Sequence, residues 1–338
     1  MRKLGVGIIG CGWVAEEHVK AFQKDKRSEV RALVSRNRAN AERYRDRYGL
    51  DCSIRSDADA MLKQDDVDIV VVCTPHNAHT DYVLAAAEAK KHVLVEKPMA
   101  TTLEDVRAQQ KAVKKNKVKS LVSFVLHWNP LLMTIDRLIE QGVFGNIFMV
   151  EVDYLHRIWV TPEQKWLASR EISGTAIITG GCHAVDALRW FARSDVEEVC
   201  AYQVKTENPI EYPGTISVNV KFADGKIGRS GTSFDAKMPY VFNIGVYGTE
   251  GSIRNDQLFA PKLCAEQQGF MKVPCILPDS ADVAHHPFQG EAAHFLDCIL
   301  GDKRPFPDFE DAAKTHEVCF AADISAEEGR PVKISELR

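Results

Sequence analysis

A short apolar run near the start of the chain, Leu4 to Ile9, leads directly into the turn Gly10-Cys11-Gly12-Trp13-Val14-Ala15. This turn fits the pattern G-x-G-x-x-G/A between a strand and a helix. The first glycine of such a turn permits the tight bend, the second lets the backbone approach a pyrophosphate, and the small last residue lets helix and strand pack closely. The helix that begins near Trp13 and Val14 also offers unpaired N–H groups to an anion. The turn therefore predicts a dinucleotide site rather than a tight turn without a ligand.

Strand and helix patterns alternate along the first part of the chain. The expected strands are 4–9, 30–34, 68–73, 92–95 and 120–125, and the expected helices are 13–23, 39–48, 79–90 and 102–114. The run from Asp68 to Cys73 is almost continuously apolar, which is typical of a strand buried on both faces of a parallel sheet. This alternation predicts a doubly wound parallel sheet. We assign residues 1–124 to an α/β Rossmann domain that binds a dinucleotide.

The pattern changes after residue 124. Helices are expected at 130–141, 183–191, 289–300 and 311–327, and strands at 147–158, 198–205, 215–222, 226–234, 241–247 and 251–254. The turn Ala223-Asp224-Gly225-Lys226 is a strong hairpin signal. Residues 125–338 are therefore expected to form an α+β domain with a large, mainly antiparallel open sheet that serves substrate binding and oligomerisation. A partner usually covers an open sheet face, so we expect a homodimer or homotetramer.

Charge and cysteine usage exclude several classes of protein. The formal net charge is -4, and the sequence has no long block of like charges. We therefore do not expect binding to nucleic acid or to an anionic membrane. The N-terminal apolar run is too short for a membrane span, and it lacks the features of a signal peptide. The nine cysteines form no CxxC pair, which favours reduced thiols and a cytoplasmic protein. No cluster of ligands predicts a metal site.

The end of the second expected strand bears on the choice between the two nicotinamide cofactors. NAD enzymes usually place Asp or Glu there for the ribose 2′-hydroxyl. This chain instead has Val34-Ser35-Arg36-Asn37-Arg38, without a carboxylate. The hydroxyl of Ser35 and the guanidinium groups of Arg36 and Arg38 suit a 2′-phosphate, so we expect NADP in preference to NAD. The alternative is that the two arginines are exposed charges at the start of a helix.

Further motifs extend through both halves of the chain. Val95-Glu96-Lys97-Pro98 follows the strand expected at 92–95. The other motifs are Gly10–Ala15 with His18, Cys73-Thr74-Pro75-His76-Asn77-Ala78-His79, Gly180-Gly181-Cys182-His183-Ala184-Val185-Asp186, Gly248–Ser252 and residues 294–297. With these motifs in this order, nearly the whole chain resembles the Gfo/Idh/MocA oxidoreductase family, which includes glucose–fructose oxidoreductase and inositol dehydrogenase. The resemblance implies an NAD(P)-dependent oxidoreductase that acts on a sugar, a cyclitol or a related polyol or ketone.

The resemblance also implies which residues hold the cofactor. Thr74, Pro75 and His79 would lie along its nicotinamide half, and Glu96 would face the nicotinamide ribose. Lys97 would contact the cofactor and point toward the reacting carbon. In the family the Lys–Pro bond is often cis, which would aim this lysine.

The expected chemistry needs a hydride acceptor, removal of a hydroxyl proton and stabilisation of the developing alkoxide. The cofactor accepts the hydride. His183 matches the family's active-site histidine and can take the proton, because histidine titrates at ~6.5. Lys97 can stabilise the alkoxide. Many dehydrogenases of the family carry Asp four residues before this histidine, but here the residue is Thr179, which can hydrogen-bond to the substrate but supplies no charge.

Candidate substrate residues lie mainly between residues 154 and 170. Tryptophan stacks against sugar rings, and arginine or lysine bonds hydroxyl or carboxylate groups. The stretch contains His156, Arg157, Trp159, Lys165, Trp166 and Arg170, of which Arg157 and Trp166 are the preferred candidates. A covering loop or a subunit contact is the alternative. Trp128 lies at the expected domain junction, and Asp186 lies one turn after His183, where it would contact substrate or only cap or pair.

Two other functions fit parts of the sequence. Some relatives in the family keep NAD tightly bound and cleave glycosidic bonds by transient oxidation, and the threonine at position 179 makes this alternative less remote. A non-catalytic, dinucleotide-binding sensor is the other alternative. The presence of both Lys97 and His183 argues against a sensor, which needs neither.

Overall fold

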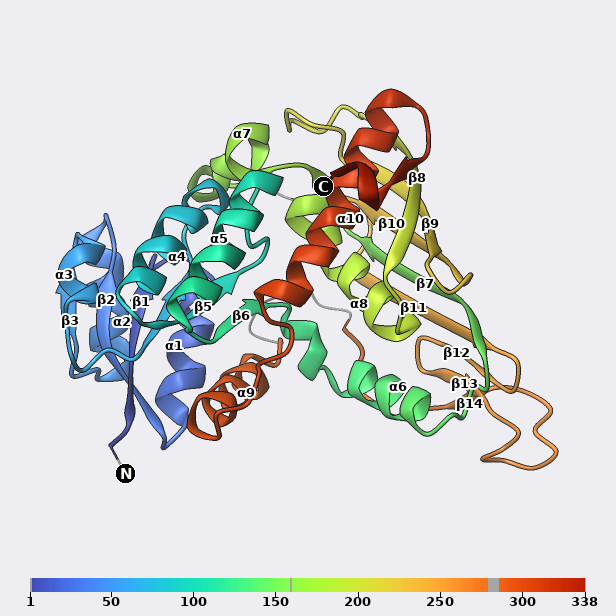
Figure 1. Ribbon diagram of the computed structural model, residues 1–338, viewed down its shortest axis with the longest axis horizontal. Helices are drawn as coiled ribbons and strands as arrows, with labels where there is room; N and C mark the ends of the chain where they lie inside the picture. The colour runs from blue at the N-terminus through green and yellow to red at the C-terminus, as the bar shows by residue number, and fades with distance from the viewer. Residues whose placement is uncertain (1, 159, 279–285, 338) are drawn as a thin grey trace. The chain divides into compact units, whose positions relative to one another are not determined.

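The computed structural model describes residues 2–158, 160–278 and 286–337, which divide into two compact units (Figure 1). The first unit has the bounds Met1–Val125 and Val283–Ala313, and the second has the bounds Leu126–Asp282 and Lys314–Arg338. The sequence analysis placed everything after residue 124 in one domain, whereas the structure joins the described residues 286–313 to the first unit. In the described part of the chain, no helix is both long and apolar enough to cross a membrane.

The first unit is built on a six-stranded parallel sheet with the order β3-β2-β1-β4-β5-β6. Its strands are β1 (Leu4–Ile9), β2 (Ser28–Val34), β3 (Ser53–Arg55), β4 (Ile69–Val72), β5 (His92–Glu96) and β6 (Ser120–Ser123). The four residues of β4 are fully buried, as the apolar run predicted. The predicted doubly wound sheet is confirmed, and its strand order reverses between β1 and β4, where ligands of such sheets bind.

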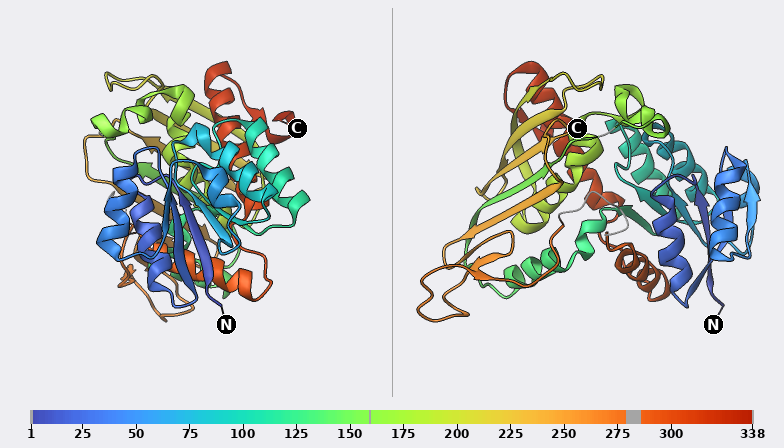
Figure 2. Two further views of the ribbon diagram at one scale, coloured as in Figure 1. Left: turned by 90° about the vertical axis from the view of Figure 1, so that its left-hand side faces the viewer. Right: turned by 180° about the vertical axis from the view of Figure 1, so that it is seen from behind.

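Helices cover this sheet (Figures 1 and 2). They are α1 (Ala15–Lys24), α2 (Arg38–Tyr48), α3 (Ala58–Leu62), α4 (His79–Glu88), α5 (Leu103–Asn116) and α9 (Phe288–Leu300). Helix α4 packs against α5, and α1 packs against α9. Gly49 ends α2 in a left-handed conformation, and its N–H donates to the carbonyl of Arg45. The short elements β3 and α3 were not predicted.

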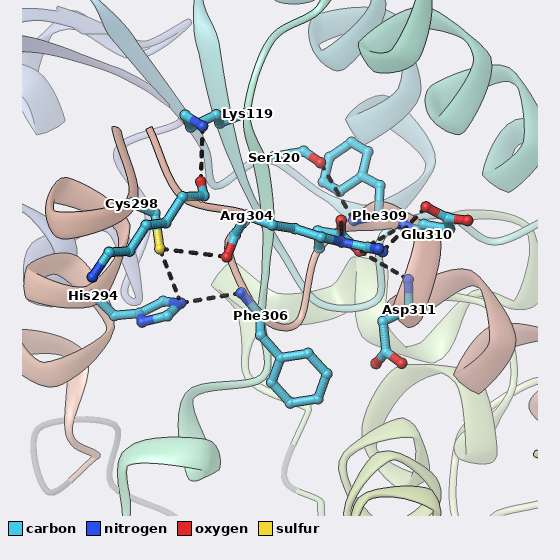
Figure 3. A network of polar contacts seen from close by, with 11 residues as sticks. Lys119, Ser120, His294, Cys298, Arg304, Phe306, Phe309, Glu310 and Asp311 are labelled. Atoms are coloured by element: carbon cyan, nitrogen blue, oxygen red, sulfur yellow. Dashed lines mark hydrogen bonds and ion pairs between the residues drawn. The ribbon is translucent and has the colours of Figure 1, made fainter. Parts of the chain in front are cut away.

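The loop between α9 and α10 (Phe309–Glu328) binds the outer edge of the sheet at β6. The N–H of Val122 donates to the carbonyl of Pro307 at 3.1 Å. The N–H of Phe309 donates to the hydroxyl of Ser120, and Lys119 Nζ donates to the carbonyl of Lys303 (Figure 3). This loop covers the backbone of an edge strand, which explains why residues up to Ala313 belong to the first unit.

The second unit is built on a nine-stranded sheet with the order β14-β13-β12-β11-β7-β10-β9-β8-β15. Strands β7 and β10 pair in parallel, and the other neighbours pair antiparallel. The strands are β7 (Ile147–Leu155), β8 (Val196–Val204), β9 (Thr215–Phe222), β10 (Ile227–Ser233), β11 (Val241–Gly248), β12 (Ser252–Arg254), β13 (Gln257–Phe259), β14 (Met271–Lys272) and β15 (Val332–Lys333). The predicted large, mainly antiparallel sheet is confirmed, including the β9–β10 hairpin at Gly225.

Helices pack on one face of this sheet (Figure 2). Helix α8 (Cys182–Ala192) packs against β7 and β10, and α6 (Pro130–Glu140) packs against α8. Helix α10 reaches β8, where the N–H of Ala201 donates to the hydroxyl of Ser325 at 2.9 Å. On the other face, alternate residues of β9 such as Asn219 and Lys221 are exposed.

Candidate active site

The two glycines of the turn between β1 and α1 have different surroundings. Gly10 has a φ of +92°, and a Cβ at this position would lie 2.5 Å from the carbonyl oxygen of Cys73. Only glycine fits there. A Cβ at Gly12 would meet no heavy atom within 4 Å. The open space beside Gly12, at the start of α1, is what the approach of a pyrophosphate to the backbone requires.

The start of α1 has no side-chain cap, and the N–H groups of Ala15 and Glu17 donate to the carbonyls of Gly12 and Val14. Val14 is the N-cap residue and makes no capping bond, while Ala15 is fully buried against the sheet. Trp13 is 55% exposed, so the motif's predicted contact residue lies at the surface. Tyr44 on α2 was missed by sequence reasoning: it is 1% exposed, and its hydroxyl donates to the carbonyl of Gly12 at 2.6 Å. This hydrogen bond holds the turn between β1 and α1 in place. No sequence motif around Tyr44 indicates it.

The end of β2 carries the residues expected to choose the cofactor. Ser35 is buried, and its hydroxyl donates to the carbonyl of Asn37 at 2.8 Å. Arg36 is exposed. Arg38 opens α2 and pairs with Glu42, at 2.7 Å, with two thirds of its side chain exposed. An exposed pair of this kind is weak, so it leaves Arg38 able to exchange partners.

Thr74, Pro75 and His79 follow β4. The Thr74 hydroxyl oxygen is buried without a hydrogen-bond partner among the described residues. His79 is fully buried, with Nδ1 2.8 Å from the carbonyl oxygen of Pro98 and Nε2 2.9 Å from that of Thr74. Burial lowers the pKa of His79 despite these two carbonyls. His79 therefore lies between the segment after β4 and the segment after β5, and its neutral ring, which carries one N–H, donates to one of the two carbonyls.

Glu96 ends β5, and Lys97 follows it through a cis Lys97–Pro98 bond. One carboxylate oxygen of Glu96 lies 2.7 Å from His18 Nε2, and the other accepts the backbone N–H of Lys97 at 3.2 Å. Burial raises the pKa of Glu96, but its interactions with His18 and Lys97 outweigh burial, and the net pKa lies below the usual value. Glu96 is therefore an ionised side chain that is committed to protein partners.

These groups share one edge of the sheet, because Ile9, Val72 and Val95 lie side by side in register just before the Gly10 turn, Thr74 and Lys97. The residues present fit a dinucleotide on three counts. They offer open space at Gly12, a start of α1 without a side-chain cap, and a buried Thr74 hydroxyl that has no hydrogen-bond partner in the described part of the chain.

In the second unit, His183 lies in the first turn of α8, directly after the π-helical turn η4 (Ile177–Gly181). Gly180 and Gly181 let this turn approach the sheet. A Cβ at Gly180 would lie 2.7 Å from the ring of Phe234, and one at Gly181 would collide with the side chain of Thr232. The glycine pair therefore sets how closely His183 approaches β7 and β10. Irregular helical turns of this type often occur at functional sites.

Tyr154 of β7 and Tyr240, which directly precedes β11, form an aromatic cluster next to His183. The ring of Tyr154 stacks on that of His183 at 6.2 Å, and Tyr240 meets Tyr154 edge-on at 5.2 Å. The Tyr240 hydroxyl is buried, and it finds no hydrogen-bond partner in the described part of the chain. Burial raises the pKa of Tyr154 and of Tyr240, so both phenols stay protonated. Sequence analysis missed both tyrosines, because the sequence pattern does not show which side chains lie opposite them in the fold.

Thr179 and Asp186 have partners inside the second unit. The Thr179 hydroxyl donates to the carbonyl of Ser173 at 2.7 Å. Asp186 is 3% exposed, lies 2.6 Å from His127 Nε2 and accepts from the hydroxyl of Thr315 at 3.2 Å. Of the two roles considered for Asp186, its contacts favour pairing over substrate contact.

The remaining substrate candidates are dispersed. Trp128 ends the short helix η2 (Val125–Trp128) and is half-buried. Arg157 forms an isolated bridge with Asp235, and Trp166 lies within η3 (Pro162–Ala168). Trp159 lies outside the described residues. Over residues 2–158, 160–278 and 286–337 no group of three or more histidine, cysteine or acidic side chains is arranged to hold a metal ion.

Comparison with known proteins identifies both halves of the chain. A family model described as an oxidoreductase family with an NAD-binding Rossmann fold matches residues 4–124, and the Gfo/Idh/MocA C-terminal domain matches residues 132–254.

Individual relatives agree with these family matches. Levoglucosan dehydrogenase of Pseudarthrobacter phenanthrenivorans is 26% identical over 316 residues, covering 81% of this chain and 80% of the relative. The NAD(+)-dependent scyllo-inositol 2-dehydrogenase of Bacillus subtilis is 27% identical over 285 residues, covering 82% and 81%. A solved levoglucosan dehydrogenase in complex with NADH has the same fold, with a TM-score of 0.87, 24% identity, and coverage of 98% and 99%. This chain belongs to the Gfo/Idh/MocA oxidoreductase family.

Proposed function

We propose that this protein is an NAD(P)-dependent oxidoreductase that transfers a hydride between nicotinamide and a sugar, a cyclitol or a related polyol or ketone. The observation that carries the proposal is the position of Lys97. It follows β5 at the sheet edge that also carries the open turn at Gly12 and the unsatisfied hydroxyl of Thr74. The names of the dehydrogenases to which the chain is similar support a substrate that carries several hydroxyl groups.

The bound cofactor supplies the hydride acceptor. We assign to Lys97 the stabilisation of negative charge on the reacting oxygen, and to His183 the transfer of its proton. Tyr240 offers a buried hydroxyl that can bond a substrate hydroxyl, and the ring of Tyr154 holds the His183 ring in place. The Thr179 hydroxyl donates its hydrogen to the carbonyl of Ser173. A threonine also carries no charge, so we do not assign to Thr179 the role that Asp has at this position in many dehydrogenases of the family.

We propose that NADP is preferred over NAD, and the arginines after β2 support this. Arg36 is exposed, and Arg38 forms a surface pair with Glu42. We expect Arg36→Ala to weaken NADPH binding by at least ten-fold while changing NADH binding less than three-fold, because only the 2′-phosphate needs the guanidinium group. Fluorescence titration with both cofactors measures this. An equal loss of affinity for NADPH and NADH, or no loss for either, contradicts the preference. One relative is an NAD(+)-dependent dehydrogenase, so this titration separates two real alternatives.

The test of the function itself begins with the purified protein. Absorbance shows whether a nicotinamide cofactor is already bound, and a screen of sugars and polyols with added cofactor follows reduction. We expect turnover with an exchangeable cofactor, and a loss of at least a hundred-fold in kcat for Lys97→Ala and for His183→Ala with cofactor binding retained. Unchanged turnover in both variants would sink the site assignment. A cofactor that does not exchange, together with release of a reducing sugar, would favour the glycosidase, and binding without any turnover would favour the sensor.

Two further properties belong to the proposal. A homodimer or homotetramer is supported by the open sheet face, where Arg229 is paired with Glu151 and Asp153. Light scattering at micromolar concentration tests it. A cytoplasmic location is supported by nine cysteines that are all free thiols.

A further inference from the structure

A buried histidine lies between Glu96, which directly precedes Lys97, and Glu291. His18 lies on α1, 1% exposed, and its Nε2 is 2.7 Å from a carboxylate oxygen of Glu96. Its other ring nitrogen, Nδ1, is 3.9 Å from a carboxyl oxygen of Glu291 on α9. The edge of the Phe288 ring packs against the imidazole at 4.9 Å and fixes its plane. The imidazole is therefore held between two carboxyl groups from separate elements.

Glu96 connects His18 to the backbone of Lys97. One of its oxygens faces His18, and the second accepts the backbone N–H of Lys97. A carboxylate that is fixed at both oxygens cannot rotate, so the backbone of Lys97 is fixed as well. Since the Lys97 side chain starts from this backbone, the reach of its ammonium group depends on His18.

Glu291 is the third member of the group. It is fully buried, and one of its oxygens accepts the hydroxyl of Ser123 at 3.1 Å. Its other oxygen has no hydrogen-bond partner among the residues that the structure describes. A second buried carboxylate close to ionised Glu96 would be costly, whereas a neutral carboxyl group tolerates this environment. In agreement, burial and then the charge of Glu96 raise the pKa of Glu291 well above its usual value.

We propose that His18 is a positioning residue for Lys97, and that it acts between one ionised acid, Glu96, and one neutral acid, Glu291. The inference rests on the proposed role of Lys97 in the reaction. It adds that the lysine is held by a buried group to which α9, almost 200 positions further along the chain, contributes Glu291 and Phe288.

Kinetics of His18 variants test the positioning role, with a sugar or polyol found in the screen as substrate. We expect His18→Leu to lower kcat at least ten-fold while changing the KM for the cofactor less than three-fold. His18→Gln places an amide N–H close to the position of Nε2 and should recover most of kcat, which a purely space-filling role would not produce. His92→Leu removes a histidine from the opposite end of β5 and should leave kcat unchanged. Wild-type kcat in His18→Leu, or equal losses in the Leu and Gln variants, overturns the proposal.

A second measurement needs no turnover and tests the two charge states. Glu291 faces His18, Glu96 and the Cys73 thiol, whose pKa burial also raises well above its usual value. A raised folded-state pKa means that wild-type stability falls as pH rises above the usual value of 4.5. Glu291→Gln should therefore raise the urea midpoint more at pH 8 than at pH 5, and Glu96→Gln should lower it at both.

A pH-independent effect of Glu291→Gln, or stabilisation by Glu96→Gln, overturns the charge assignment, and this result also decides the matter if His18→Leu does not fold. Full turnover in Lys97→Ala would instead contradict the proposed role of Lys97 in the reaction. The charge states of Glu96 and Glu291 would still be tested by the urea measurements.

Discussion

Gly10 and Gly12 are two positions apart, but the space beside them differs completely. A Cβ at Gly10 meets the backbone of Cys73, whereas one at Gly12 enters open space. We expect Gly12→Val to keep the unfolding free energy within about 1 kcal/mol of wild type, because a β-branched residue costs little in an open position. The added methyl groups would fill the space that a pyrophosphate needs, so the Kd for NADPH and NADH should rise at least ten-fold.

Urea denaturation and fluorescence titration of the same sample measure both quantities for Gly12→Val. Gly10→Val is the matched control, because its collision with Cys73 and its positive φ should destabilise the fold itself. Unimpaired cofactor binding by a stable Gly12→Val protein would mean that the dinucleotide does not approach this turn.

At the scale of helices and strands, sequence pattern and structure agree where the signal is local. Strand β4 is a continuous apolar run, and α2 ends at Gly49, and both were predicted close to their observed bounds. Strand β3 has three residues and β15 has two, which is too short for any periodicity to appear. Strand β7 ends at Leu155, earlier than the expected end at residue 158. Beyond it, Arg157 forms an isolated bridge with Asp235, and the N–H groups of His156 and Ile158 still donate to the carbonyls of Ser233 and Phe234.

The candidate site follows the same division. Lys97 and His183 carry a motif in their immediate neighbours, so the sequence indicates them directly. Tyr44, Tyr240 and Glu291 have no such motif, and their importance depends on packing between distant segments: Glu291 bonds Ser123, which is 168 positions away. A sequence contains this information only through the completed fold.

Helix α10 carries a buried acid whose titration is accessible to experiment. Asp323 accepts the hydroxyl of Thr175 at 2.7 Å, and burial raises its pKa from 3.8 to about 7, although Thr175 opposes the shift. Since the folded-state pKa is raised, the stability associated with this group is complete below pH 4 and is lost as pH rises toward 7. Asp323→Asn should remove this loss, because the amide is neutral at every pH and can still bond Thr175.

The size of the Asp323 effect follows from the shift. At 1.36 kcal/mol per pKa unit, the gain in unfolding free energy of Asp323→Asn over wild type should be about 4 kcal/mol larger at pH 8 than at pH 4. Chemical denaturation at both pH values measures it. A pH-independent difference between the two proteins would show that Asp323 is ionised in the folded chain at neutral pH.

At the scale of the whole molecule, the chain crosses between its two units more than once. The sequence predicts α9 correctly as a helix, but an amphipathic pattern states only that one face is buried, not which core buries it. In the structure α9 packs against α1, and it supplies Glu291 to the environment of Glu96. The Rossmann unit is therefore completed by a segment that follows strands β7 to β14 of the second unit in sequence.

This arrangement predicts the behaviour of fragments. Residues 1–125 alone would expose the face of α1 that α9 covers and the edge of β6 that Pro307 covers. We expect this fragment to unfold at lower urea concentration and to bind NADPH at least ten-fold more weakly than a fragment in which a flexible Gly/Ser linker joins residues 1–125 to residues 286–313. Circular dichroism and fluorescence titration compare the two. Equal stability and affinity of the two fragments would mean that α9 only covers the surface of the first unit. This result would contradict the inference that Glu291 belongs to the buried group that holds Lys97.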